Sequence, residues 1–144
     1  MAQNISNPSL QRLDVLVGAW EIESPQFPGG RGSETFEWLE GGAFLMQHSE
    51  AKHAGFPNGT MVIGRDEATE TYCMLYFDSR GVSRIYQMSL IDGIWKLWRE
   101  EPGFWQRFSG TFSDDGRTIR GYWEKSDDGS KWEHDFDLIY TKAL

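Results

Sequence analysis

His134 stands in the segment of the sequence where apolar and polar residues alternate most regularly. Its alternate neighbours form one face of a predicted strand, made of Trp132, His134, Phe136, Leu138 and Tyr140. Successive strand side chains point to opposite sides, and the intervening positions are mostly acidic, so this apolar face is the predicted inner one. An imidazole in an apolar interior can ligate haem iron by itself, or act as an acid or base beside the hydroxyl of Tyr140 or Tyr86.

Other predicted strands also place polar side chains on otherwise apolar faces. The residues concerned are Arg84 and Tyr86 with Met88, Gln106 with Phe108, His48 with Phe44 and Met46, and Trp38 with Phe36. A buried polar group needs a hydrogen-bond partner, so these groups either satisfy one another in a filled core or converge on a ligand in an apolar pocket. Arg84 is the most informative of them, because an interior guanidinium is a natural anchor for a carboxylate or phenolate.

The predicted ligand-binding residues are therefore the inward polar side chains together with the aromatic and methionine side chains beside them. They are Trp38, His48, Arg84, Tyr86, Met88, Gln106, Phe108, His134, Phe136 and Tyr140.

Other chemistry finds less support in the sequence. No metal site is expected, since His48 and His53 face opposite sides of one strand and no thiol or carboxylate at ligand spacing joins His48 to His134. The chain contains no Gly-x-Ser-x-Gly elbow and no phosphate-binding glycine loop. Cys73 lies in an apolar segment that is typical of a packing residue. The sequence therefore indicates no particular catalytic residue.

Turn signals divide the chain into short segments. Asn-Gly, Asp-Gly and similar pairs recur about a dozen residues apart, and such spacing is typical of an antiparallel meander. The predicted strands are 18–24, 32–39, 43–53, 60–65, 71–78, 82–91, 94–100, 103–113, 117–126 and 130–141. Only residues 8–17 predict a helix, because Leu10, Leu13, Leu16 and Val17 share one face. A short helix before the first strand could cover one end of a barrel.

Composition limits the classes of partner. The 144 residues carry a formal net charge of −8, which predicts no nucleic-acid or anionic-membrane partner. Aromatic residues make up 15% of the chain, enough for some of them to line a cavity. The single cysteine, the polar start of the chain and the absence of a long apolar run predict a soluble cytoplasmic protein.

The run Leu16-Val17-Gly18-Ala19-Trp20 resembles the Gly-x-Trp start of the calycin superfamily, which includes the lipocalins. In those folds an early tryptophan, just after a short helix, packs across the closed end of the barrel, and Trp20 matches that position. Residues 37–45, followed by Ile63-Gly64-Arg65-Asp66, resemble a group of bacterial calycin-like proteins classed as a domain of unknown function. That resemblance spans most of the chain but implies no particular activity.

The chain is also similar, more distantly, to nitrobindin and to the fatty-acid-binding proteins. Nitrobindin is a ten-stranded barrel that binds haem through a histidine near its C-terminus, and the resemblance implies that His134 corresponds to it. The fatty-acid-binding proteins have ten strands and an interior arginine that holds a carboxylate. They also carry a helix pair between the first two strands, for which residues 25–31 are too short.

Together these observations predict one all-β domain over residues 1–144, an up-and-down antiparallel barrel of about ten strands spanning residues 18–141. The predicted function is binding of a small hydrophobic or aromatic ligand inside the barrel, with Arg84, His134 and Tyr140 holding its polar end. Haem bound through His134 is one form of this prediction. The alternatives are a cofactor-free isomerase, cyclase or hydrolase in the same pocket, and a filled barrel that acts as an interaction or homodimerisation module.

Overall fold

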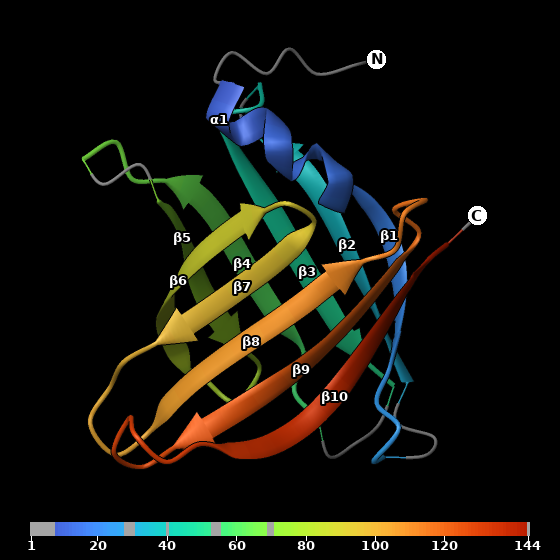
Figure 1. Cartoon of the computed structure of the whole chain (residues 1–144). Helices are drawn as coiled ribbons and strands as arrows, with labels where there is room; N and C mark the ends of the chain where they lie inside the picture. Colours follow the sequence, from blue (N-terminus) through green and yellow to red (C-terminus); the bar gives the residue numbers. More distant parts are fainter. Residues whose placement is uncertain (1–7, 28–30, 40, 53–55, 69–70, 144) are drawn as a thin grey trace.

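The chain forms a closed antiparallel β-barrel in a computed structural model that describes residues 8–27, 31–39, 41–52, 56–68 and 71–143. Its ten strands are β1 Gly18–Glu23, β2 Arg31–Leu39, β3 Phe44–Ala51, β4 Gly59–Arg65, β5 Tyr72–Asp78, β6 Ser83–Ile91, β7 Ile94–Arg99, β8 Trp105–Phe112, β9 Thr118–Ser126 and β10 Glu133–Lys142. Each strand pairs with the next, and β10 returns to pair with β1 (Figure 1). Closure leaves none of these ten strands with a free edge. The predicted fold class is confirmed.

The hairpin between β6 and β7 illustrates how the sequence sets this connectivity. Ile91 pairs with Ile94, which leaves Asp92 and Gly93 as a two-residue turn. Both turn residues have positive φ, 54° at Asp92 and 75° at Gly93. A two-residue hairpin turn of this type matches the right-handed twist of the strands, and Asp-Gly is one of the pairs that adopt it most readily.

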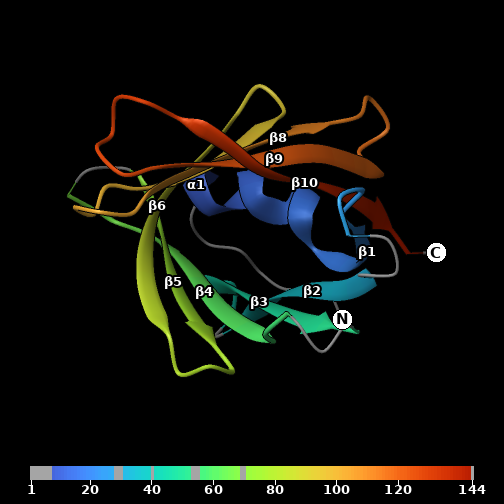
Figure 2. The same ribbon diagram turned by 90° about the horizontal axis from the view of Figure 1, so that it is seen from below.

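One end of the barrel is closed by the N-terminal segment. Helix α1 (Pro8–Gln11) continues into the 3-10 helix η1 (Arg12–Leu16), so the predicted helix 8–17 consists of two short pieces. Leu13 and Leu16 are fully buried. The view along the barrel in Figure 2 shows these helices surrounded by the ring of strands. Within the described residues, no helix has the length and apolar character that a membrane span requires.

Two tryptophans attach the 3-10 helix to the sheet. The indole of Trp20 donates to the carbonyl of Leu16 at 2.8 Å, and the indole of Trp38 donates to Oδ1 of Asp14 at 3.1 Å. Both indole rings are buried and have a satisfied N–H. Trp20 therefore occupies the place at the closed end that the Gly-x-Trp resemblance predicts.

Beside this end the interior is packed solid. Phe108 of β8 lies over Gly110 of its own strand and Gly121 of the neighbouring β9, where larger residues would collide with its ring. A Cβ at Gly121 would lie 2.6 Å from the Phe108 ring, and a Cβ at Gly110 would lie 3.0 Å from it. These glycines make room for an aromatic ring and thus fix the packing of the barrel between β8 and β9.

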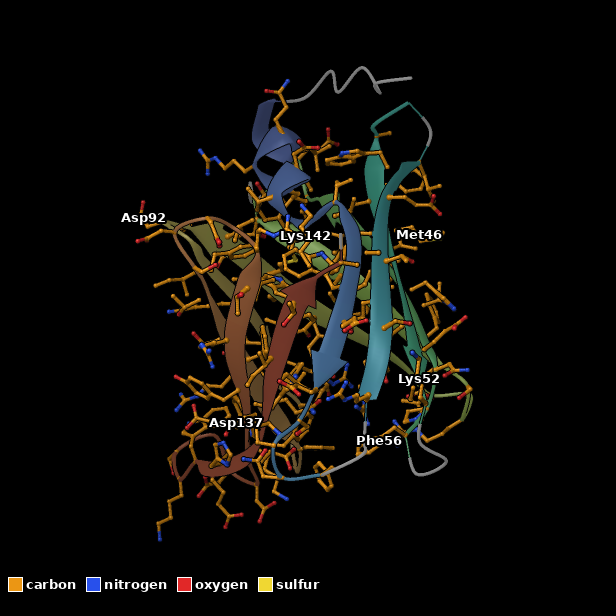
Figure 3. All side chains as sticks on the ribbon, turned by 90° about the vertical axis from the view of Figure 1, so that its right-hand side faces the viewer. Met46, Lys52, Phe56, Asp92, Asp137 and Lys142 are labelled. Atoms are coloured by element: carbon orange, nitrogen blue, oxygen red, sulfur yellow. The ribbon has the colours of Figure 1, made fainter. Side chains whose placement is uncertain are left out.

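The opposite end of the barrel holds the connections β1–β2, β3–β4, β5–β6, β7–β8 and β9–β10. In Figure 3, Phe56 and Asp137 lie towards this end, whereas Asp92 and Lys142 lie towards the helices. The start of the β1–β2 connection is held to β10, because Gln26 Nε2 donates to Asp137 Oδ2 at 2.8 Å and Ser24 Oγ donates to the Asp137 carbonyl at 2.6 Å.

Candidate ligand cavity

A cavity of about 420 Å³ occupies the half of the barrel away from the helices. Its size lies within the range typical of small-molecule sites, about 300–1,000 Å³. It is lined from nearly all sides of the barrel by Ile22, Ser24, Arg31, Gly32, Ser33, Glu34, Gln47, Ser49, Glu50, Ala51, Phe56, Pro57, Gly59, Met61, Met74, Tyr76, Arg80, Arg84, Tyr86, Trp95, Leu97, Gln106, Trp123, Phe136, Leu138 and Tyr140. The exposed members of this set, such as Arg31, Phe56 and Arg80, place its mouth at the end opposite the helices.

Aromatic rings in edge-on contact form much of the cavity wall. Trp95 packs against Tyr140 with ring centroids 5.8 Å apart, and Tyr86 packs against Trp123 at 5.7 Å and Tyr76 at 5.9 Å. Such T-shaped pairs stabilise ring positions beyond simple burial. This aromatic part of the wall offers an apolar surface to a ligand.

Glu34 and Gln47 form a buried hydrogen-bonded pair in this wall. Gln47 Nε2 donates to Glu34 Oε2 at 2.7 Å, and the two residues are only 2% and 8% exposed, respectively. Burial raises the pKa of the Glu34 carboxyl to about 8, and the hydrogen bond from Gln47 opposes part of that rise. At neutral pH Glu34 is thus mostly an uncharged carboxylic acid.

Tyr140 and Trp95 lie at the same inner end of the cavity, nearer the helices. Burial, with a smaller contribution from the Glu34 carboxyl, raises the pKa of the Tyr140 phenol well above its usual range. Trp95 is 1% exposed, and its indole Nε1 has no hydrogen-bond partner among the residues that the structure describes. Within the same residues, Gln47 Oε1 also has none. We call Glu34, Gln47, Trp95 and Tyr140 the inner polar cluster.

Arg84 lies on the wall nearer the mouth. Its guanidinium carbon lies 5.9 Å from the ring centroid of Tyr76 and 5.4 Å from that of Phe104, distances at which a cation is attracted to an aromatic face. Across the described part of the chain, Arg84 forms no ion pair with a carboxylate. Beside it the Tyr86 hydroxyl donates to Gln106 Oε1 at 2.8 Å. Burial raises the pKa of Tyr86, and the Arg84 guanidinium offsets part of that rise.

A second arginine at the mouth is already paired. Arg80 Nη2 lies 2.7 Å from Asp78 Oδ2, and the Tyr76 hydroxyl donates to the same oxygen at 2.7 Å. These hydrogen bonds, that of Arg80 above all, hold the pKa of the Asp78 carboxyl well below its usual range. Arg84 is therefore the better candidate for an anion anchor.

The predicted inward orientation of His134 is wrong. In β10 His134 pairs with Glu124 but Phe136 pairs with Trp123, so Asp135 is an extra residue that makes a β-bulge. In a regular strand, residues two apart face the same side. The extra residue of the bulge breaks this rule, so His134 and Phe136 face opposite sides of the sheet. The His134 side chain is 50% exposed, and its Nε2 lies 2.8 Å from Asp137 Oδ1 on the outside of the barrel.

The predicted inward orientation of His48 is also wrong. On β3 the buried positions are Leu45 and Gln47, which place His48 on the outer face. There its Nδ1 lies 3.3 Å from Thr60 Oγ1, and its Nε2 lies 3.5 Å from Glu50 Oε1. The apolar character of Met46 misled the assignment, because Met46 faces outwards too.

The other predicted residues do face the interior. Arg84, Tyr86, Gln106, Phe136 and Tyr140 line the cavity. Trp38, Met88 and Phe108 are buried in the packed half of the barrel and do not line it. Whether any of these ten residues contacts a ligand remains a prediction.

The inner polar cluster was missed in large part, although the sequence holds a signal for it. Glu34 shares its strand face with Phe36 and Trp38, both of which are inward. Trp95 likewise alternates with the buried Leu97. The alternation of residues therefore places Glu34 inside the barrel. Glutamate is rarely buried in proteins, however, so its residue type argued against an interior position.

No protein-family model matches this chain, and no curated protein matches its sequence. Its fold is similar to that in the crystal structure of Rv2717c from M. tuberculosis, with a TM-score of 0.64 and 14% sequence identity. The match covers 98% of this chain and 100% of that chain. At this identity the likeness supports the barrel fold alone, so the resemblance to the bacterial calycin-like group stays a prediction.

Proposed function

We propose that this protein binds a small apolar or aromatic molecule inside the barrel. The observation that carries the proposal is the cavity of about 420 Å³, walled by aromatic rings and containing a few converging polar groups. A filled barrel would have side chains in that space. Burying an apolar ligand against such a wall contributes about 25 cal/mol for each Å² of apolar surface removed from water.

Arg84 is the proposed anchor for an anionic group on that ligand. Its guanidinium has no carboxylate partner within the described residues, and it is held over the Tyr76 and Phe104 rings. A charge-assisted hydrogen bond to a half-buried guanidinium contributes about 1.5 kcal/mol or more, which is roughly a tenfold change in affinity.

The geometry does not fit haem bound through His134. The axial imidazole would have to point into the cavity, whereas His134 lies outside and contacts Asp137. Enzyme chemistry that uses His134 with Tyr86 or Tyr140 meets the same obstacle, because the barrel wall separates these side chains. We therefore propose neither haem binding nor acid–base catalysis through His134.

The test is binding of anilinonaphthalene sulfonate, a dye with an aromatic body and one anionic group. The protein should enhance the dye's fluorescence, and Arg84→Ala should weaken binding about tenfold. Arg120→Ala is the matched control, because Arg120 is an exposed arginine on the outer face of β9 and should change nothing. Native mass spectrometry of protein purified from cells should in addition reveal a bound small molecule.

No fluorescence enhancement, together with no bound molecule in native mass spectra, would contradict the proposal. If Arg84→Ala and Arg120→Ala lost the same affinity for the dye, the dye would bind the charged outer surface. That result would also contradict the proposal.

A further inference from the structure

The inner polar cluster joins four polar side chains from four strands at the inner end of the cavity. Glu34 and Gln47 are hydrogen-bonded across β2 and β3, Tyr140 of β10 interacts electrostatically with Glu34, and the ring of Tyr140 packs on Trp95 of β7. Packing alone does not require such a concentration of polar groups. In a barrel of this size, apolar residues at these positions would stabilise the fold equally well.

Two polar atoms of the cluster have no hydrogen-bond partner among the described residues. Gln47 gives its amide N–H to Glu34, which leaves Gln47 Oε1 without a donor among the described residues. Trp95 Nε1–H lacks an acceptor among those residues. An unsatisfied buried donor or acceptor destabilises a protein. Both of these atoms are also almost inaccessible, so a ligand in the cavity would meet the cluster through the Glu34 carboxyl, which as a neutral acid both donates and accepts, and through the Tyr140 hydroxyl.

We infer that the inner polar cluster is a subsite for an uncharged ligand group that both donates and accepts hydrogen bonds, such as a carboxamide or a hydroxyl. This inference rests on the proposed ligand-binding function and adds to it the chemistry of the buried end of the ligand. The amide N–H or the hydroxyl would donate to a Glu34 carboxyl oxygen, and the ligand oxygen would accept from the Glu34 O–H or from the Tyr140 hydroxyl.

Charged groups fit the subsite poorly. A carboxylate has no proton to donate to the buried Glu34 carboxyl beside which it would lie. An ammonium has no lone pair to accept from the Tyr140 hydroxyl. Burial of either charge in this aromatic surrounding is costly unless it is paired. An anionic group is better placed at the mouth, against Arg84.

Protonation of Glu34 couples this subsite to pH. The titratable and charged groups that line the same cavity are Tyr76, Tyr86 and Tyr140, with Arg31, Glu50, Arg80 and Arg84 towards the mouth. The tyrosines remain largely uncharged up to pH 9, because burial raises the pKa of each above the ordinary value of 10.0. Among the cavity groups that the structure describes, Glu34, with a pKa of about 8, is the one expected to change charge between pH 6 and pH 9.

The experiment compares naphthamide and naphthoate, which share one aromatic body and differ in charge. Each is titrated into the wild-type protein, Glu34→Leu, Glu34→Gln and Arg84→Ala by isothermal calorimetry at pH 6. Naphthamide should lose about tenfold in affinity in Glu34→Leu and little in Arg84→Ala, and naphthoate should show the reverse. Glu34→Gln keeps an uncharged group that can donate and accept, so it should bind naphthamide like the wild type.

The pH dependence supplies a second measurement that does not depend on the fold of Glu34→Leu. Between pH 6 and pH 9 the affinity of the wild type for naphthamide should fall about tenfold, because only about a tenth of Glu34 stays protonated at pH 9. Glu34→Gln should show no such fall.

The outcomes separate the two proposals. If both probes depend on Arg84 alone and neither responds to position 34 or to pH, the subsite inference is overturned while ligand binding in the barrel stands. If neither probe nor the dye binds the wild type, the ligand-binding proposal fails, and the subsite inference fails with it.

Discussion

Glu34→Gln should remove a specific pH dependence of stability. The folded protein holds Glu34 as a neutral acid with a pKa of about 8, raised by burial from 4.5. The folded state therefore binds more protons than the unfolded state between these two pH values, so stability falls as pH rises through this window. Stabilisation by the neutral form is complete below pH 4.5 and is lost as pH rises towards 8.

The size of the effect follows from the two pKa values. Each unit of pKa difference corresponds to about 1.4 kcal/mol, and between pH 5 and pH 7 the wild type should lose about 2.5 kcal/mol through Glu34. Glutamine has the shape of the neutral acid and can still accept the hydrogen bond from Gln47 Nε2. Glu34→Gln should therefore keep its stability over this pH range.

The assay is urea unfolding of both proteins at several pH values from pH 5 to pH 8. The quantity to plot is the difference in unfolding free energy between the wild type and Glu34→Gln, because titrations common to both proteins cancel in it. Carboxyls with lowered pKa, such as Asp78 and Asp128, act in the opposite sense and at lower pH: their stabilisation is lost only as pH falls. A difference that stays constant from pH 5 to pH 7 would show that Glu34 ionises freely and would refute the account of its burial.

Two further predictions concern the packed end of the barrel. Gly121→Ala should destabilise the protein by about 1–3 kcal/mol in urea unfolding, because its Cβ would overlap the Phe108 ring, whereas Gly64→Ala meets no atom within 4 Å and should cost nothing. Similar stabilities for the two variants would contradict this packing. Trp20→Phe should lower the free energy of unfolding by about 1–3 kcal/mol, because it removes the indole donor from the Leu16 carbonyl. In this variant the backbone amides near Leu16 should exchange with deuterium faster than in the wild type. Unchanged exchange there would show that Trp20 does not hold the 3-10 helix.

Turn residues and alternation predicted the barrel and much of its interior. Strands β6 and β8 are regular, so Arg84, Tyr86, Gln106 and Phe108 face inwards as their alternation with apolar residues predicts. In these strands the inner and outer faces also differ in composition. The prediction succeeded where one face alone is buried and the strand is uninterrupted.

The errors have two physical causes. In β10 the bulge at Asp135 reverses the phase between His134 and Phe136, and nothing in the residue types marks an inserted residue. In β3 both faces carry apolar residues. Met46 points outwards, and the residues beside it on the outer surface of β5 and β6, Leu75 and Ile85, are apolar as well. Hydrophobicity therefore cannot tell the two faces of β3 apart.

The inner polar cluster lay beyond prediction for a different reason. Which buried polar atoms are satisfied depends on side-chain positions from strands far apart in the sequence, as for Gln47 and Trp95. Strand alternation gives the face of each residue but not its partners across the barrel.

The most direct test of ligand binding within the barrel is the pattern of intermolecular nuclear Overhauser effects from naphthamide in solution. We expect contacts from its ring protons to the ring protons of Trp95 and Tyr140, both of which line the cavity. Contacts confined to outward rings such as Trp98 and Tyr122 would place the molecule on the outer surface and would contradict a binding site inside the barrel.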